Sequence, residues 1–473
     1  MGVYETALKL FEALIAAYKK VASATPNSDD FLIVANGCKV WIAKCLIEIG
    51  KYTDAIDYLN QVLDINASDF SNNLEPAIKQ LHLQAGLALA TARAKLGETH
   101  AALKILDVLV YDAEKTYGNG GKFTLEVREF RAQQRVIVGD LEAAKQEYEI
   151  LIPLMYELYG DNEGLTILTK ANYQTLIHAK YDIGAAINNL VELYDHVWEE
   201  FGYGILFVKV NESLAEVLEE ANLTENAIKK RKEIHAFYER YHWNKLPKYR
   251  ENLKKITSLL WSLNQYNEAI EQYKILVDNN IQIFGETNIV TLKSKENLAG
   301  YMKSNNQLEE ASTIYKSLVG NYTDILGKDH SNTLTSQFLL ATTLHQNSNL
   351  NEAKVIYEDL LAKQIATLGE DDLNTVNTRH NLAYALGLLD EPSQAKNLFL
   401  KNIPYQTQLY GENHEQTLSA NYLFNMLLLD ENPNKENALR FSRLIDRIEL
   451  HLGASSQLAI IGKQVLDEII EPE

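Results

Sequence analysis

Apolar residues recur three or four positions apart along most of the chain, in pairs of segments separated by short polar turns. In the clearest pair, the first segment runs from Thr291 to Met302 and the second from Leu308 to Leu318, with residues 303–307 as the turn between them. This spacing is typical of amphipathic α-helices that bury one face. The pattern predicts a first helix, named helix A here, a tight turn and a second helix, named helix B.

Glycine marks a 42-residue period in these helix pairs. Two series of glycines are each spaced by 42 residues: Gly118, Gly160 and Gly202, and then Gly285, Gly327, Gly369, Gly411 and Gly453. The step from Gly202 to Gly285 is 83 residues, so one residue is lost across two periods. A fixed period in the range of roughly 20–50 residues is typical of a stacked repeat array, in which each unit buries its apolar face against its neighbours.

The residues around each glycine predict how the helices end and begin. The glycine is expected to end helix B, because it adopts the left-handed backbone common at helix C-termini. The residue three positions later is expected to cap the next helix A, since its side chain can accept from free backbone N–H groups. These capping residues are Asn288, His330, Asp372 and His414.

Alanine recurs near the start of each predicted helix B, where a small side chain lets two helices approach closely. The series comprises Ala102, Ala144, Ala186, Ala227, Ala269, Ala311, Ala353, Ala395 and Ala438, with Ala55 and Ala7 upstream at wider spacing. A large aromatic residue follows four positions later at Tyr148, Tyr273, Tyr315, Tyr357 and Phe399. The count of these anchors predicts ten to eleven helix pairs in an all-α array.

The period also divides the chain into four predicted parts. Residues 1–117 fit the pattern loosely and are expected to form divergent repeats, whereas residues 118–240 and 241–455 fit it well. Residues 456–473 are expected to form a C-terminal capping helix. Between the two well-fitting parts, the tract from residue 241 to 247 replaces the glycine turn and predicts a bend or seam.

Composition limits the classes of partner. The chain has 473 residues, 46% of them hydrophobic, and a formal net charge of -19. This acidic balance disfavours nucleic acid and anionic membranes as partners, and no apolar run is long enough to span a bilayer. Cys38 and Cys45 lie seven apart on one predicted helix, about 10 Å along its axis, too far for a disulfide. We interpret them as buried thiols of a cytoplasmic protein, with a metal or redox role as the alternative.

The chain resembles the tetratricopeptide repeat family in its 42-residue form, the form found in kinesin light chains. The residues that carry the resemblance are Leu326-Gly327-Lys328-Asp329-His330, Thr333-Leu334, Asn351-Glu352-Ala353 and Asn381-Leu382-Ala383. The histidine-proline pair common in the family is here His330-Ser331 and His414-Glu415. The resemblance implies an α-α superhelix, a right-handed solenoid in which helix A lines a concave groove that binds peptide segments.

Kinesin light chains hold a peptide backbone with asparagines that directly precede the Leu-Ala of helix A. The matching positions here are Asn172, Ser213, Lys255, Asn297, Leu339 and Asn381. A side-chain amide can donate and accept at once, so it can pair with a peptide backbone. The alternative is that these asparagines are solvated or bonded within the array.

Further side chains are expected to face the groove. Lys254, Lys255 and Lys293 would hold acidic side chains or a terminal carboxylate, beside a glutamate-rich stretch at residues 212–220. Trp261, Phe338 and Tyr384, with His345 and His380 beside them, would take an apolar anchor, since aromatic residues often dominate binding energy. Ordinary solvated charge and packing between repeats are the alternative.

Catalytic and metal motifs are absent from the sequence: it has no His-Glu-x-x-His, no glycine-rich phosphate loop and no Cys-x-x-Cys. We therefore expect no enzymatic activity, no cofactor and no metal site. His330 and His414 are interpreted as helix caps, and His345 and His380 could approach each other across neighbouring helices. The basic run 229–232 lies on a predicted helix B and is interpreted as a solvated outer face, with a second docking surface as the alternative.

These patterns predict a non-enzymatic scaffold or adaptor that binds a protein or peptide in its groove. The alternative is a regulatory or sensor module of a larger signalling or transcription-regulating protein. The chain begins directly in an expected helix B, as though cut from a longer chain, which favours that alternative. Self-association is left open by the sequence, as is the identity of the partner.

Overall fold

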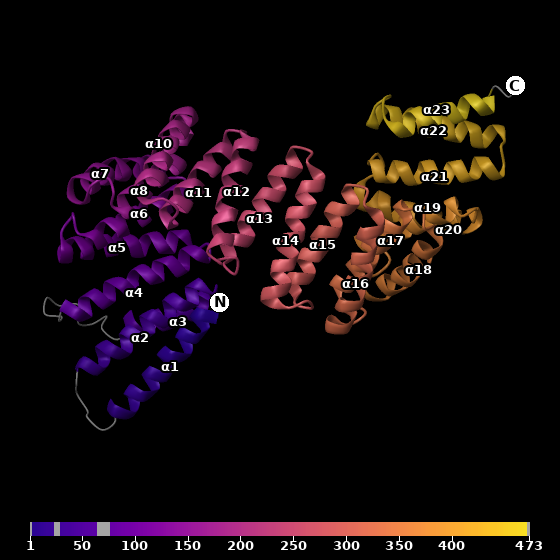
Figure 1. Cartoon of the computed structure of the whole chain (residues 1–473). Coiled ribbons are helices and arrows are strands. Elements are labelled where there is room, and N and C mark those ends of the chain that lie inside the picture. The colour runs from indigo at the N-terminus through magenta and orange to yellow at the C-terminus, as the bar shows by residue number, and fades with distance from the viewer. Residues whose placement is uncertain (1, 23–28, 64–75, 471–473) are drawn as a thin grey trace. The chain divides into compact units, whose positions relative to one another are not determined.

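The computed structural model describes residues 2–22, 29–63 and 76–470, and every regular element in these ranges is a helix (Figure 1). The predicted all-α fold, an α-α superhelix of paired helices, is confirmed. The chain forms two compact units, Met1–Leu263 and Asn264–Glu473, named unit 1 and unit 2 here. The finer division into repeat groups stays a prediction.

Unit 1 alternates the two helix types. Its helix A segments are α2 (Asp29–Glu48), α4 (Pro76–Lys95), α6 (Lys122–Ile137), α8 (Gly164–Tyr173) with η2 (Gln174–His178) and α9 (Ala179–Tyr181), α11 (Ile205–Glu220) and α13 (Pro247–Ser262). Its helix B segments are α1 (Gly2–Ala22), α3 (Tyr52–Leu63), α5 (Thr99–Tyr117), α7 (Leu141–Tyr159), α10 (Ile183–Phe201) and α12 (Thr224–Arg240).

Unit 2 continues the alternation. Its helix B segments are α14 (Tyr266–Phe284), α16 (Leu308–Leu326), α18 (Leu350–Thr367), α20 (Pro392–Tyr410) and α22 (Lys435–Leu452). Its helix A segments are α15 (Ile289–Ser304), α17 (Ser331–Gln346), α19 (Leu373–Leu388), α21 (Glu415–Glu431) and α23 (Gln457–Ile470). The described residues therefore contain eleven segments of each type, and α23 coincides with the predicted C-terminal helix.

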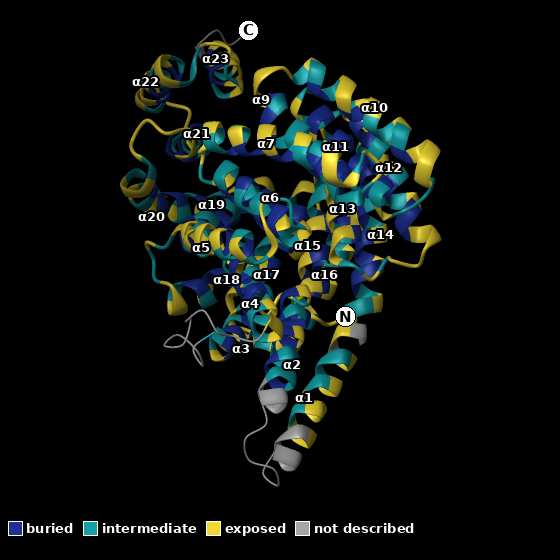
Figure 2. Ribbon diagram, turned by 90° about the vertical axis from the view of Figure 1, so that its left-hand side faces the viewer, coloured by how far each residue is buried: buried dark blue, intermediate teal, exposed yellow. Residues whose placement is uncertain are grey.

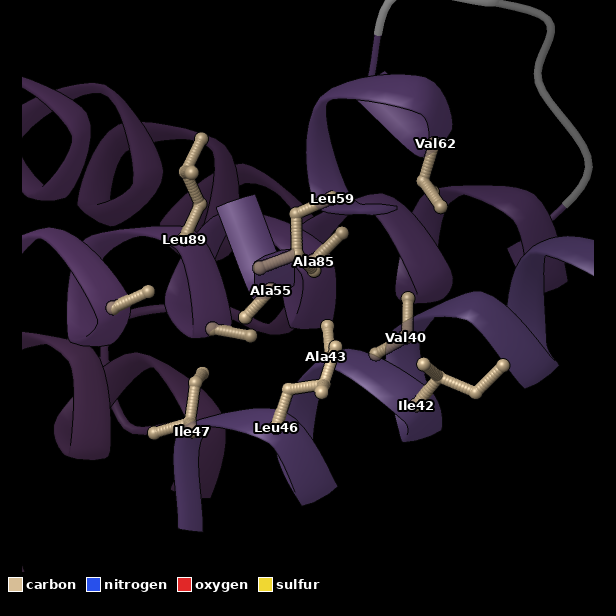
Figure 3. Packing of buried hydrophobic residues seen from close by; sticks show 12 residues of the cluster. Val40, Ile42, Ala43, Leu46, Ile47, Ala55, Leu59, Val62, Ala85 and Leu89 are labelled. Carbon is tan, nitrogen blue, oxygen red and sulfur yellow. The ribbon is translucent and has the colours of Figure 1, made fainter. Parts of the chain in front are cut away.

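Small and aromatic anchors fill the interior as the sequence predicted. The alanines from Ala102 to Ala395 in the series are fully buried, and so is Ala55, whereas Ala438 is only partly buried. The ring of Tyr315 is almost fully buried, as are its counterparts in the series. Buried residues line the helix faces that meet, as Figure 2 shows for the whole chain and Figure 3 for the cluster around Ala55 and Leu59 of α3.

The glycines at the junctions from helix B to helix A all have positive φ, but their backbone is not the left-handed helical one that the sequence suggested. Gly285 has φ 90° and ψ 161°, and Gly327 has φ 96° and ψ 159°. This combination of positive φ with extended ψ is essentially restricted to glycine. The chain thus leaves each helix B through a backbone conformation that a side chain would oppose, which explains why glycine persists at 42-residue spacing.

A second periodic series of positive φ lies at the turns from helix A to helix B, and the sequence pattern did not reveal it. Its members are Gly50, Gly97, Gly139, Asn222, Asn264, Asn306, Ser348 and Asp390. At Asn306 φ is 60°, and the N–H of the next residue, Gln307, donates to the Met302 carbonyl over 2.8 Å. This bond defines a Schellman-type helix end. Asparagine and aspartate tolerate this conformation, so the residue type varies and the period is hidden.

The caps and the register of helix A agree with the sequence pattern. The side chains of Asn288, His330, Asp372 and His414 each accept from a backbone N–H in the following turn, which confirms the interpretation of the two histidines as caps. The residue missing from the 42-residue period lies directly after Gly202, because α11 begins three residues after that glycine and α15 begins four after Gly285.

One helix A departs from regular geometry. In the repeat that begins at Gly160, the helix runs through the π-helical segment η2 and ends at Tyr181, and Asp182 alone forms the turn to α10. A π-turn takes up more residues than an α-turn. The extra residues come from the shortened turn, so α10 still begins in register with other helix B segments.

Cys38 and Cys45 are buried free thiols on α2, and burial raises the pKa of both. Within the described residues, no helix is both long and apolar enough to cross a bilayer.

Candidate functional site

Successive helix A segments contact one another within each unit, as α2 does with α4, α8 with α11, α17 with α19 and α19 with α21. Among the described residues, successive helix B segments make fewer such contacts. An array whose A helices are closer together than its B helices curves with helix A on the inside. The side chains of helix A that point away from helix B therefore form the inner face of each unit.

In unit 2, side chains link three consecutive helix A segments along this inner face. Lys303 of α15 donates to the hydroxyl of Thr342 on α17 over 2.8 Å. His345, one turn further along α17, packs its ring on that of Tyr384 of α19, with ring centroids 5.1 Å apart. Tyr384 is still 40% exposed, and Phe338 of α17 is half-buried. The structure thus brings together three predicted groove residues in one partly open aromatic face.

The histidines of this face are uncharged at neutral pH. Burial, and then the nearby Lys303 ammonium, lower the pKa of His345. Burial lowers the pKa of His380 to about 4. His380 contacts Phe399 and the amide of Gln406, both on α20, whereas His345 contacts Tyr357 and Tyr384. The two histidines therefore serve different contacts and do not form the pair that the sequence suggested.

The asparagines of the predicted ladder are used in different ways. Asn297 is exposed and donates one amide hydrogen to the Tyr273 hydroxyl over 3.1 Å. Asn381 is half-buried on α19, where no hydrogen-bond partner is found among the described residues. Asn172 of unit 1 donates to the buried Glu129 carboxylate over 2.6 Å. Asn172 is thus bonded within the array, which is the alternative interpretation of the ladder.

The lysines on the inner face pair with acidic side chains of the chain itself. Lys255 of α13 lies 3.4 Å from Glu219 of α11, and Lys248 lies 3.0 Å from Glu212. Lys293 of α15 pairs with Glu296 one turn along its own helix, at 3.3 Å. The predicted acidic stretch at 212–220 is therefore largely neutralised from the next helix. Lys254 is exposed on α13, and Trp261 on the same helix is half-buried.

The basic run 229–232 does not form a uniformly solvated face, so that interpretation was wrong in part. Lys229 and Lys232 are exposed. Arg231 is buried and donates through Nε to Glu219 over 2.7 Å, and Lys230 lies 3.5 Å from the centroid of the Tyr194 ring. Two of the four residues are thus engaged in packing.

Unit 1 has a hollow on its inner face that sequence reasoning missed. A cavity of about 320 Å³ lies across α2, α4 and α6 and is lined by Lys44, Glu48, Gln84, Leu87, Thr91, Phe123 and Glu126 with Ile47 and Ala88. Trp41, one turn before Lys44, is 53% exposed and carries the Lys44 ammonium 4.9 Å from its ring centroid. Register could have identified Trp41, which lies nine residues before Gly50 as Asn297 lies nine before Asn306.

Residues 38–69, on α2 and α3 and beyond, match the family model of the tetratricopeptide repeat. The chain contains a tetratricopeptide repeat. The resemblance drawn from the sequence is thereby confirmed, although the matched repeat lies in the part that fits the 42-residue pattern most loosely. Within the described residues, no cluster of three or more His, Cys, Asp or Glu side chains is arranged to hold a metal ion.

Several solved structures share this repeat architecture at low identity. TPR-like repeats of a kinesin light chain kind from Podosopora anserina are 20% identical, with a TM-score of 0.37, and cover 43% of this chain and 96% of theirs. BtubC (BKLC) from P. vanneervenii is 16% identical, with a TM-score of 0.35, covering 49% and 92%. A Rap protein complexed with competence and sporulation factor is 13% identical, with a TM-score of 0.36, covering 79% and 98%. A search of curated protein sequences finds no match.

Proposed function

We propose that the chain is a non-enzymatic scaffold that binds a peptide segment of a partner protein on the inner face of its helix A segments. Stacked helix pairs build extended surfaces of this kind. The observation that carries the proposal is the open aromatic face of unit 2, where Tyr384 and His345 stack in contact with solvent and Asn381 has a free amide beside them.

This face fits a peptide with an apolar anchor followed by a polar backbone. Phe338, His345 and Tyr384 offer rings on α17 and α19, and a neutral histidine costs little to desolvate. The Asn381 amide can donate to and accept from a peptide bond. Lys303 and Lys293 on α15 provide positive charge at one end, so the anchor would precede an acidic side chain or a terminal carboxylate.

A display selection tests the proposal and requires no assumption about the sequence of the partner. Peptides would be selected from a random library on the full chain, and their affinities measured by fluorescence anisotropy. The variant H345A/Y384A/N381A should bind the selected peptides at least about tenfold more weakly, the equivalent of about 1.4 kcal/mol. Two or three ring and amide contacts are enough for such a loss.

The control variant carries V355A and L400A. Val355 of α18 and Leu400 of α20 are both more than 60% exposed on helix B segments, so they test apolar truncation outside the inner face. Equal affinity of the selected peptides for wild type and for H345A/Y384A/N381A would contradict the proposal. A loss of binding by the control variant would move the site to the helix B side.

A further inference from the structure

Three arginines lie on one side of α6 and converge on acidic side chains of the two flanking helices. Arg131 donates through Nε to Glu147 of α7 over 3.2 Å and through Nη1 to Asp107 of α5 over 3.3 Å. Arg135 bonds Glu147 over 3.0 Å, and Arg128 donates to Glu147 through Nε over 3.3 Å. The three guanidinium groups thus bridge α5, α6 and α7, which are consecutive in the array (Figure 1).

These charges occupy positions that are apolar in the best-preserved repeat. Counted from Gly118 and from Gly285, Arg131 corresponds to Leu298 and Arg135 to Met302, while Glu147 corresponds to Ile314. A buried ion cluster is usually no more stabilising than an apolar layer of similar volume. Stability alone therefore gives no reason for the exchange of a Leu-Met-Ile layer for a cluster of charges.

The cluster has more positive than negative charge. Glu147 is almost completely buried, with a side chain 3% exposed, while Asp107 is 57% exposed. Three guanidinium groups face these two carboxylates, and each keeps N–H donors that no described residue accepts. The neighbouring Glu129 does not neutralise the excess, because its carboxylate accepts from Gln133 and Asn172 on the other side of α6.

The surface beside the cluster is apolar. Val108 and Tyr111 of α5 and Ile150 of α7 are each more than half exposed. Lys104 and Glu149, further out on the same helices, have opposite charges and offset each other. On a helix with 3.6 residues per turn, the arginine side of α6 lies roughly 180° from Glu126, which lines the inner cavity. The arginine side therefore belongs to the outer surface of unit 1.

We propose that this outer surface, formed by α5, α6 and α7, binds an acidic peptide segment of a partner protein. A carboxylate of the segment takes the free N–H donors of Arg128, Arg131 and Arg135, since the guanidinium fork matches carboxylate geometry. Apolar side chains next to that carboxylate cover Val108, Tyr111 and Ile150. This site is separate from the inner face and does not depend on the function proposed for it.

The test uses a labelled dodecapeptide of alternating glutamate and leucine, with a glutamine-for-glutamate version for comparison. We expect the wild-type chain to bind the glutamate peptide about tenfold more tightly, the effect of one or two charge-assisted hydrogen bonds. Binding should also protect the backbone amides of α5 and α7 from hydrogen exchange. Equal affinity for the two peptides would overturn the proposal, and so would tighter binding of a phosphoserine version by more than about tenfold, which would make phosphate the ligand.

Two variants locate the site. R131L/R135M/E147I restores the apolar layer of the repeat at Gly285, so it should fold and lose the preference for glutamate. R128Q leaves two arginines on Glu147 and should reduce the preference about threefold; it decides the question if the triple variant does not fold. R447Q, at an exposed arginine of α22 paired with Glu412, and H345A/Y384A should both keep it. A folded triple variant, or an R128Q variant, that retains the full preference would contradict the site.

Discussion

The repeats that begin at Gly118 and at Gly285 have the same register and fill the layer between their helices in opposite ways. In the repeat at Gly285, Leu298 is buried against helix B, as an amphipathic helix requires. In the repeat at Gly118, Arg131 holds that position and Glu147 faces it from α7. The comparison shows that the 42-residue period specifies the backbone path, whereas the chemistry of each layer is free to vary.

Removal of Glu147 should give the largest effect. The substitution Glu147→Leu leaves three largely buried guanidinium groups without their shared partner, and we expect a loss of about 3–5 kcal/mol in the stability of unit 1. All four tryptophans, Trp41, Trp198, Trp243 and Trp261, belong to unit 1, so a urea titration followed by tryptophan fluorescence reports on this unit. The matched change Ile314→Val in the apolar layer should cost only about 0.5–1.5 kcal/mol. A loss below about 1 kcal/mol for Glu147→Leu would mean that the charged layer behaves like the apolar one.

The glycines at the start of both repeats should respond alike. A Cβ added at Gly118 or Gly285 meets no atom within 4 Å, so the cost of Gly→Ala comes from backbone strain and should be about 1–3 kcal/mol at each. Hydrogen exchange of α5 and α6, and of α14 and α15, measures the two effects separately. If one glycine tolerated alanine and the other did not, the repeats would differ in backbone as well as in layer chemistry.

The equivalent glutamates of the two repeats, Glu129 and Glu296, should differ in pH dependence. Burial raises the pKa of Glu129 above its ordinary value, against opposing hydrogen bonds from Asn172, Gln133 and Tyr148. A group whose pKa is raised by folding loses stability as pH rises through that pKa. Glu129→Gln should therefore stabilise unit 1 at pH 7 relative to pH 4, measured as the shift in thermal midpoint. Glu296→Gln, where the side chain pairs with Lys293, is the comparison. A constant shift for Glu129→Gln across that range would show that its carboxyl is not disfavoured by burial.

Turns from helix A to helix B should show the smallest effect. Gly139 and Asn306 hold the same place in the two repeats, with φ of 85° and 60°. Since both residue types tolerate this conformation, Gly139→Asn and Asn306→Gly should each change stability by less than about 0.5 kcal/mol. Thermal unfolding followed by circular dichroism measures the change. A loss of more than about 1 kcal/mol at either site would show that the turn is constrained by more than its φ.

The fold could be predicted from the sequence because its signals are local. Helical spacing, the glycine period and the caps at Asn288 and His330 each depend on residues a few positions apart. The second periodic turn was hidden, because Gly, Asn, Ser and Asp all satisfy its φ. The division into two units was also hidden, since it depends on contacts that no local pattern records.

The candidate site was only partly predictable. Projection onto helix A placed His345 and Tyr384 on the same face, and they do stack. It also assigned Asn172 and Lys255 to a ligand, although Glu129 and Glu219 bond them. Position on a helix shows which way a side chain points, but its partner on the next helix depends on packing. The remaining groove residues and the cytoplasmic location stay predictions.

The π-helical segment η2 has a consequence for how such an array can change in length. Where one helix A lengthened at the expense of its turn, and where a residue was lost after Gly202, the next helix still began in phase. Single-residue insertions and deletions are thus absorbed within one hairpin and do not shift the helices downstream. We expect the junction after Gly202, already one residue shorter than its equivalents, to accept an inserted epitope with little loss of folded protein, because only the loop has to lengthen.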